Sequence, residues 1–208
     1  MNVPSDFENL IKLLILGDIS VGKSNFLFRF IEDKYIVDHL PTIGFDYKSK
    51  IITLPDKSVV KLQIWDTVGQ EQFMSINKSL LQKVHGIILL YDITDMGSFE
   101  HLDNWFKVIR EVNENANVIL VANKCDMDDK RLISEEEGNK LATENNISFV
   151  EASAKENINV TETFVKIADE ILSEAQKKSI HFDDTLSDGK KRKSLTYKKQ
   201  SKKCLKCC

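Results

Sequence analysis

A glycine-rich loop follows a short apolar segment near the start of the chain. The segment 10–16 leads directly into Gly17–Ser24, which reads GDISVGKS. A loop with this spacing can turn its backbone N–H groups toward phosphate oxygens, while Lys23 adds a positive charge and the Ser24 hydroxyl can coordinate Mg²⁺. A helix beginning at the loop would add its dipole to the attraction for an anion. The pattern favours a phosphate-binding loop over an ordinary glycine-bounded turn between a strand and a helix.

A carboxylate and a second glycine follow another apolar strand. Residues 59–65 form this strand, Asp66 ends it, and Gly69 lies in the turn beyond. A carboxylate at a strand end is well placed to hold the coordination shell of Mg²⁺, and the Gly69 amide can face a terminal phosphate. These residues extend the predicted phosphate site.

Two more motifs indicate which base is bound. Asn123-Lys124-Cys125-Asp126 follows the apolar strand 118–122, and Ser153-Ala154-Lys155 follows the strand 147–150. The Asp126 carboxylate can accept hydrogen bonds from the N1–H and 2-amino groups of guanine, which adenine does not offer in that arrangement. A site with buried acceptors rejects the wrong base strongly, because those acceptors would lose their partners. We therefore expect selectivity for GTP and GDP.

The elements that must position these motifs alternate along the chain. Strands are expected near residues 10–16, 44–54, 58–65, 86–92, 118–122 and 147–150, and helices near 22–31, 70–82, 97–113, 134–144 and 159–175. This order predicts an α/β fold with a six-stranded, mostly parallel, doubly wound sheet and helices on both faces. The turn 55–58 is too short for a crossover helix, so the strands beside it form an antiparallel edge hairpin. Ligands of such sheets lie beyond the carboxyl ends of the strands, where all four motifs fall.

Length and composition set the domain organisation. The 208 residues, of which 42% are hydrophobic, suffice for one domain over residues 1–175 and a tail over 176–208. No apolar run approaches the roughly 18 residues that a membrane span requires, and the first residues lack a secretion-signal pattern. We therefore expect the protein to fold in the cytosol.

Charge is distributed unevenly along the chain. The tail carries eleven Lys or Arg against three Asp, whereas the rest carries 18 basic and 29 acidic residues, for a net charge of −3 overall. A basic, aromatic-poor tail cannot build a core and is expected to be disordered. Taken alone, it also fits a nucleic-acid-binding arm, and the run Lys190–Lys193 fits a nuclear signal.

With these motifs in order, the chain resembles the Ras-like small GTPases and, within them, the Rab family of membrane-traffic switches. The resemblance extends from about Asp6 to Ala175. It rests on the segments 17–24, 40–44, 61–67, 85–88 and 91–95, together with Cys207-Cys208. It implies a P-loop small G domain that cycles between GTP- and GDP-bound states and regulates vesicle trafficking.

The resemblance also assigns site residues. The nucleotide-binding set is Asp18, Ile19, Ser20, Val21, Gly22, Lys23, Ser24, Asn25, Tyr35, Thr42, Gly69, Asn123, Lys124, Asp126, Ser153, Ala154 and Lys155. Mg²⁺ is assigned to Ser24, Thr42 and Asp66, and the attacking water to Gln70. The switch segments are roughly 35–44 and 66–80, and both become ordered when GTP is bound. The effector surface comprises Ile43, Gly44, Phe45, Tyr47, Trp65 and Leu80; for Trp65, packing into a core is the alternative.

The terminal cysteines decide how the tail is interpreted. Cys207 and Cys208 are similar to the double-cysteine Rab ending that receives two geranylgeranyl groups, and two lipids with a polybasic segment give stable anchoring. A zinc site at Cys204 and Cys207 is disfavoured because no second ligand pair lies nearby. The implied location is the cytoplasmic side of an intracellular membrane, cycling with the cytosol. The implied partners are an exchange factor, a GTPase-activating protein, a GDP-dissociation inhibitor, a Rab escort protein and effectors, with no nucleic acid.

Two departures from the family pattern concern the rate of hydrolysis. Ile19 and Val68 flank the expected γ-phosphate position, where the family favours small residues. Branched side chains there are expected to crowd Gln70, the water or an incoming arginine finger, which predicts slow hydrolysis. The alternative function is a GTP-bound membrane scaffold that hydrolyses slowly or not at all. Retention of Gln70 favours a switching enzyme, whereas Ile19 and Val68 favour the scaffold.

Overall fold

A computed structural model describes residues 9–37, 45–67, 74–177, 182–183 and 193–195 of the chain. Its main sheet contains β1 (Asn9–Leu16), β2 (Phe45–Thr53), β3 (Val59–Thr67), β4 (Gly86–Asp92), β5 (Asn117–Asn123) and β6 (Ser148–Glu151). These strands lie in the order β2-β3-β1-β4-β5-β6. The β2–β3 pair is antiparallel, and the pairs β1–β3, β1–β4, β4–β5 and β5–β6 are parallel. The predicted mixed sheet with one edge hairpin is confirmed.

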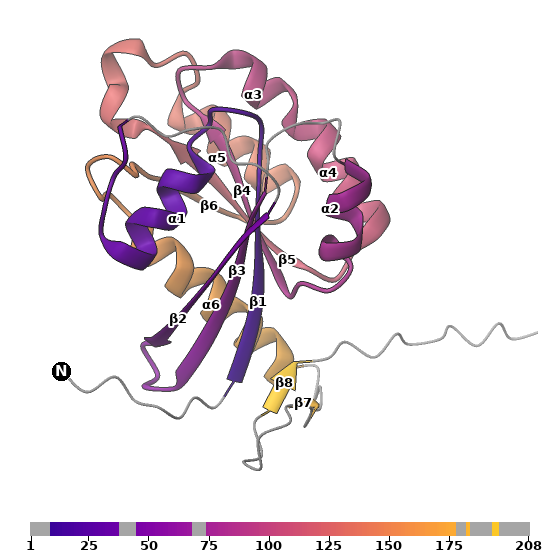
Figure 1. Cartoon of the computed structure of the whole chain (residues 1–208). Coiled ribbons are helices and arrows are strands. Elements are labelled where there is room, and N and C mark those ends of the chain that lie inside the picture. The colour runs from indigo at the N-terminus through magenta and orange to yellow at the C-terminus, as the bar shows by residue number, and fades with distance from the viewer. Residues whose placement is uncertain (1–8, 38–44, 68–73, 178–181, 184–192, 196–208) are drawn as a thin grey trace, which may run out of the picture.

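Helices cover both faces of this sheet (Figure 1). The α-helices are α1 (Lys23–Glu32), α2 (Met74–Leu81), α3 (Met96–Glu100), α4 (Leu102–Val112), α5 (Glu135–Glu144) and α6 (Val160–Lys177). A 3₁₀ helix, η2 (Cys125–Lys130), lies between β5 and α5. Side chains of α1 and α6 join one core cluster, whereas α4, α5 and the end of α2 join a second. The arrangement is that of a doubly wound α/β domain.

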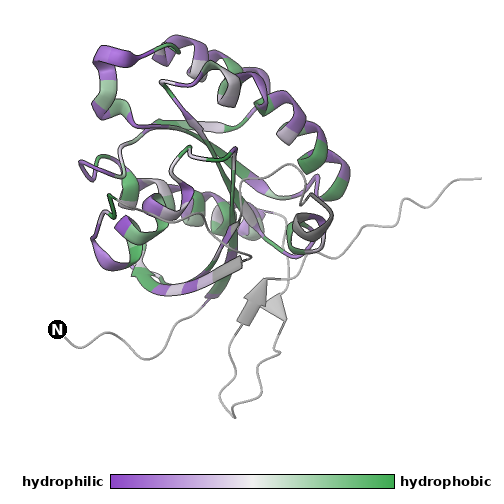
Figure 2. Ribbon diagram, turned by 45° about the horizontal axis from the view of Figure 1, so that its top comes forward, coloured by the Kyte–Doolittle hydropathy of each residue, from purple (hydrophilic) through white to green (hydrophobic). Residues whose placement is uncertain are grey.

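The alternation of side chains along the central strands creates the two cores. In β4, Ile88 and Leu90 face the α1–α6 side, whereas Ile87, Leu89 and Tyr91 face the α4–α5 side. All seven β4 residues are buried. A strand covered on both faces must be apolar at successive positions, and the central strands are correspondingly hydrophobic in Figure 2. The apolar runs seen in the sequence therefore belong to the middle of the sheet.

Several elements differ from the expected boundaries. The single helix expected over 97–113 is divided at His101, where the Asn104 N–H reaches the His101 carbonyl three residues back, the hydrogen bond of a tighter 3₁₀ turn. The helix η2 was not expected. The helix expected over 70–82 is described from Met74, because residues 68–73 lie outside the described residues.

The tail contributes two short strands that the composition did not predict. They are β7 (Phe182–Asp183) and β8 (Lys193–Leu195), which pair antiparallel with each other. β8 also pairs in parallel with the start of β1, where Asn9 is opposite Lys193 and Leu10 is opposite Ser194. The remaining tail positions, on which the expectation of disorder rests, lie outside the described residues.

Phe164 of α6 is the anchor of the first core. It is fully buried, and its ring stacks on Phe30 of α1 with centroids 3.8 Å apart and lies 5.6 Å from the Phe26 ring. We expect Phe164→Ala to lower the free energy of unfolding by about 3–5 kcal/mol through lost burial and an unfilled cavity. Lys166→Ala, on the exposed face of the same helix, should change it by less than about 0.5 kcal/mol. Urea denaturation of both variants with GDP bound measures the difference; equal effects would contradict this packing.

Candidate functional site

The phosphate loop is packed against the ends of two strands. Gly17 has φ +137°, and a Cβ there would lie 2.2 Å from the Leu90 carbonyl oxygen of β4. Gly22 has φ +97°, and a Cβ there would lie 2.5 Å from Nδ2 of Asn123. Both positions combine a left-handed backbone with no room for a side chain, so glycine is required at each. The two glycines therefore hold the loop close to β4 and β5.

The N-terminus of α1 faces into this loop. Gly22 is its N-cap residue and offers no side chain to bind the first N–H groups, and the first turn contains no acidic residue. The helix is ten residues long, and its N-terminal N–H groups with the positive end of its dipole favour an anion. The loop and helix together form a site suited to phosphate.

Lys23 is a buried cation at the first position of α1. Its side chain is 5% exposed, and its Nζ donates a hydrogen bond to the Asp18 carbonyl oxygen. Burial lowers the pKa of Lys23 to about 8, and the nearby Asp66 and Asp18 carboxylates only partly offset that effect. A phosphate anion beside Nζ would supply the missing negative charge. Lys23 is therefore prepared for an anionic ligand.

Ser24 and Asp66 form a pair of hard oxygen donors beside Lys23. The Ser24 hydroxyl donates to Oδ2 of Asp66 at 2.5 Å, and Asp66 is only 2% exposed at the end of β3. Within the described residues, no group of three His, Cys, Asp or Glu gathers as a metal cluster. Mg²⁺ bound with nucleotide phosphates typically takes one or two protein ligands, so a hydroxyl and one carboxylate fit this ion.

The Asp126 carboxylate is fixed by its neighbours. Ser153 Oγ donates to Oδ1 of Asp126 at 2.6 Å, and Lys155 Nζ lies 3.7 Å from Oδ2. Ser153 Oγ also accepts the Glu156 N–H at 3.0 Å. The two loops that the sequence assigned to base recognition therefore meet, with a charged acceptor held in one orientation.

Asn123 and Lys124 connect the base loops to the phosphate loop. The buried Asn123 donates from Nδ2 to the Val21 carbonyl at 2.7 Å and accepts the Ala154 N–H at 3.3 Å. Lys124 donates to the Ser20 carbonyl at 2.9 Å. These residues act as connectors between the loops.

Two further residues of this network were missed by the sequence reasoning. Asp92, at the end of β4, lies 2.6 Å from Lys124 Nζ, and its position at a strand end was the available signal. Arg29 on α1 donates to the carbonyls of Ala154 and Lys155, each at 2.9 Å. No spacing rule indicates Arg29, because its acceptors are more than 120 residues away.

Asn25 of α1 contacts the segment that follows the helix. The Asn25 side chain forms two hydrogen bonds with the Ile36 backbone, each at 3.0 Å. The preceding residue, Tyr35, is 38% exposed. Asn25 thereby fixes the start of the first expected switch segment along the helix.

The Asp18 carboxylate is directed toward α4. Its Oδ2 lies 2.5 Å from Nδ1 of His101, and its Oδ1 accepts the indole N–H of Trp105 at 2.9 Å. Neither partner was identified from the sequence. Asp18 therefore connects the outer side of the loop to α4 through its side chain, and its carbonyl binds Lys23 on the inner side.

The surface expected to bind effectors is only partly described. Tyr47 and Trp65 are opposite each other in the β2–β3 pair, with ring centroids 5.5 Å apart, and Tyr47 is 46% exposed. Trp65 and Leu80 are partly buried against the second core. Trp65 thus has the packing role of the alternative interpretation and also adjoins an exposed aromatic residue.

The remaining assigned positions cannot be placed. Thr42, Ile43, Gly44, Val68, Gly69, Gln70, Cys207 and Cys208 lie outside the described residues, and only the backbone of Phe45 is described.

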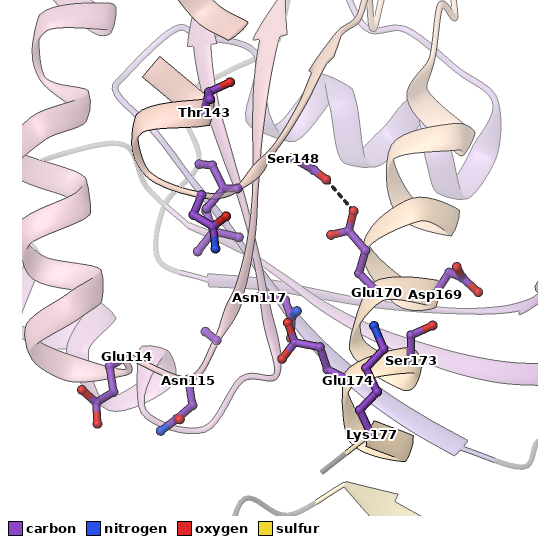
Figure 3. Close-up of a pocket in the computed structure, with 14 residues that line it drawn as sticks. Glu114, Asn115, Asn117, Thr143, Ser148, Asp169, Glu170, Ser173, Glu174 and Lys177 are labelled. Atoms are coloured by element: carbon purple, nitrogen blue, oxygen red, sulfur yellow. Dashed lines mark hydrogen bonds between the residues drawn. The ribbon is translucent and has the colours of Figure 1, made fainter. Parts of the chain in front are cut away.

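A separate pocket of about 730 Å³ lies near the start of β5 and the end of α6 (Figure 3). Carboxylates of Glu114, Asp169, Glu170 and Glu174 line it, and Ser148 Oγ donates to Glu170 at 2.5 Å. None of the assigned site residues borders it. The phosphate and base motifs lie at the opposite, carboxyl ends of the strands.

The chain is similar to several known proteins. The family described as the Ras family matches residues 12–173. The chain is 47% identical over 166 residues to the GTP-binding protein ypt2 of Schizosaccharomyces pombe, covering 79% of this chain and 82% of that protein. It is 45% identical over 163 residues to the Ras-related protein SEC4 of Candida albicans (78% and 77%) and 42% identical over 187 residues to human Ras-related protein Rab-3A (89% and 84%). None of the described helices is long and apolar enough to cross a membrane.

The buried Lys23 predicts a specific pH dependence of the nucleotide-free protein. Its pKa is about 8 when folded and 10.5 when unfolded, so between these values the unfolded chain binds more protons and stability rises with pH. We expect wild type to gain up to about 3 kcal/mol over this window relative to Lys23→Met. Chemical denaturation from pH 7 to 10.5 measures this difference, and a gap that does not change with pH would refute the depressed pKa.

Proposed function

Since the chain belongs to the Ras family and is a Rab-type small GTPase that regulates vesicle trafficking, we propose that the loops at the carboxyl edge of its sheet form the nucleotide site. The observation that carries the proposal is the convergence of a buried Lys23 and a fixed Asp126 carboxylate at one edge. The Lys23 ammonium would neutralise a phosphate, and the Asp126 carboxylate would accept hydrogen bonds from guanine. Asn123 joins the two halves through Val21 and Ala154.

The phosphates are assigned to the loop 17–24. Backbone N–H groups at the start of α1 and the Lys23 ammonium would surround the anionic oxygens. The low exposure of Lys23 supports this assignment, because a buried ammonium is costly until an anion neutralises it. Ile19, Ser20 and Val21 contribute the intervening loop backbone.

Mg²⁺ is assigned to Ser24 and Asp66, together with Thr42. The 2.5 Å contact between the Ser24 hydroxyl and Asp66 places two oxygen donors together at the phosphate loop. When bound, the ion supplies charge neutralisation between the phosphate groups. Asp66 then orients Ser24, and Lys23 holds the phosphate from the other side.

Switching and hydrolysis are assigned to Tyr35, Thr42, Gly69 and Gln70. Thr42 and Gly69 would sense the γ-phosphate, and Gln70 would orient the attacking water. The bonds from Asn25 to the Ile36 backbone support a fixed start for the first switch, with Tyr35 beside the guanine. Effectors would recognise 43–45 with Tyr47, Trp65 and Leu80.

Hydrolysis is proposed to be slow. The Ile19 side chain is 53% exposed on the phosphate loop, where a branched group would compete for space with Gln70, the water or a partner's arginine. Val68 would add to this crowding from the other side of the γ-phosphate.

The tail is proposed to attach the protein to a membrane. Cys207 and Cys208 would carry geranylgeranyl groups, and the basic residues would add attraction to anionic lipids on the cytoplasmic face of an intracellular membrane. This arrangement requires an escort protein for prenylation and a GDP-dissociation inhibitor for return to the cytosol. An exchange factor, a GTPase-activating protein and effectors complete the proposed cycle.

Base recognition can be tested by changing the Asp126 acceptor. Asp126→Asn should weaken GDP binding on the order of 10⁴-fold, because an amide cannot accept from both N1–H and the 2-amino group. The same variant should bind xanthosine diphosphate, whose 2-oxo group accepts from the Asn amide. Titration calorimetry with GDP and with xanthosine diphosphate measures this change in base specificity. Unchanged GDP affinity would exclude Asp126 from base recognition, and xanthosine diphosphate binding would show that the variant is folded.

Hydrolysis can be tested by single turnover of preloaded GTP. Gln70→Leu should slow phosphate release at least about 10-fold, because the water loses its orienting group. Ile19→Ser should accelerate it about 5-fold if about 1 kcal/mol of crowding is relieved. Leu132→Ser, at another exposed apolar position, is the matched control and should leave the rate unchanged. Equal rates for wild type and Ile19→Ser would remove the crowding argument.

A further inference from the structure

The outer side of the phosphate loop is held by two donors from one helical segment. His101, at the bend between α3 and α4, and Trp105 of α4 both contact the Asp18 carboxylate, at 2.5 Å and 2.9 Å. The Asp18 side chain is 16% exposed and Trp105 is 3% exposed, so the indole bond is largely shielded from water. Each carboxylate oxygen therefore has its own partner.

The same Asp18 binds Lys23 through its backbone. The Asp18 carbonyl accepts the Lys23 Nζ hydrogen bond, while the adjacent Gly17 is fixed against Leu90. With its side chain held from outside, Asp18 has little freedom to rotate its carbonyl away from Lys23. The position of the phosphate-binding ammonium thus depends on contacts made outside the loop.

Asp18 also presents an electrostatic problem. A carboxylate on a loop that binds phosphates repels them unless its charge is turned away and hydrogen-bonded. His101 and Trp105 hold that charge on the side of the loop that faces α4. Hydrogen bonds from these donors to an ionised carboxylate are stronger than bonds between neutral groups.

We propose that His101 and Trp105 are positioning residues of the nucleotide site, which act through Asp18 to slow nucleotide release. This inference rests on the proposed assignment of phosphates to the loop 17–24. Neither residue needs to touch the nucleotide. Their effect passes through the Asp18 side chain to its carbonyl and from there to Lys23.

The experiment is a double-mutant cycle on the full chain, with release of a fluorescent GDP analogue as its readout. His101→Leu should accelerate release about 10-fold, because a charged hydrogen bond is lost. His101→Asn should release the analogue nearly as slowly as wild type, since its amide nitrogen can occupy the position of Nδ1 and donate a hydrogen bond to Asp18. Trp105→Phe, which keeps the ring packing and removes the N–H, should also accelerate release. Asn104→Leu, at an exposed neighbouring position of α4, should have no effect.

The decisive comparison uses the Asp18→Ala background. If His101 acts through Asp18, His101→Leu should produce no further acceleration there. The inference would be overturned if His101→Leu accelerated release equally in both backgrounds, or if the His101→Leu single variant released the analogue at the wild-type rate. Urea denaturation of each variant separates a release effect from a general loss of stability. Failure of the wild type to bind the GDP analogue would instead contradict the proposed nucleotide site.

Discussion

The buried amide of Asn123 is the interaction on which the arrangement of the site depends. At the end of β5 it donates to the Val21 carbonyl and accepts the Ala154 N–H, so one side chain links the phosphate loop with the loop after β6. A Cβ on Gly22 would lie only 2.5 Å from its Nδ2, so the amide also excludes a side chain at that position. Because the amide is 1% exposed, each lost bond would leave a buried polar group unpaired. The loops are therefore held together before any ligand arrives.

That preformed arrangement explains how the phosphate side can keep a buried cation. Lys23 donates a hydrogen bond to the Asp18 carbonyl, and the charges of the Asp66 and Asp18 carboxylates only partly compensate for its lost hydration. The remaining cost is present in the nucleotide-free protein and is relieved when an anion binds. Stability is thus sacrificed locally and recovered on binding, which requires loops rigid enough to withstand the unrelieved charge.

Features that depend on neighbouring residues could be predicted from the sequence, whereas contacts between residues far apart in the sequence could not. The strands β1, β4 and β5 could be predicted because burial on both faces imposes an apolar run, and the turn of loop 17–24 because its glycines have a fixed local spacing. The contact of His101 with Asp18 joins positions 83 residues apart, and the hydrogen bond from Arg29 to the Ala154 carbonyl joins positions 125 residues apart. Such bonds leave no periodic signal. The bend at His101 was missed because its residues are compatible with a continuous helix.

The cations in the two halves of the proposed site differ in their exposure to water, although the Asp126 side chain itself is only 8% exposed. Lys23 is 5% exposed, whereas the Lys155 side chain beside Asp126 is 58% exposed. A charge in a dry site interacts strongly with phosphate, while an exposed ion pair contributes little energy but can fix the direction of a carboxylate. Affinity should therefore come mainly from the phosphate half, and discrimination from the base half. In the proposed site, Asn123 fixes the separation of the two halves so that both could contact one ligand, and Asp18 connects the phosphate half to α4.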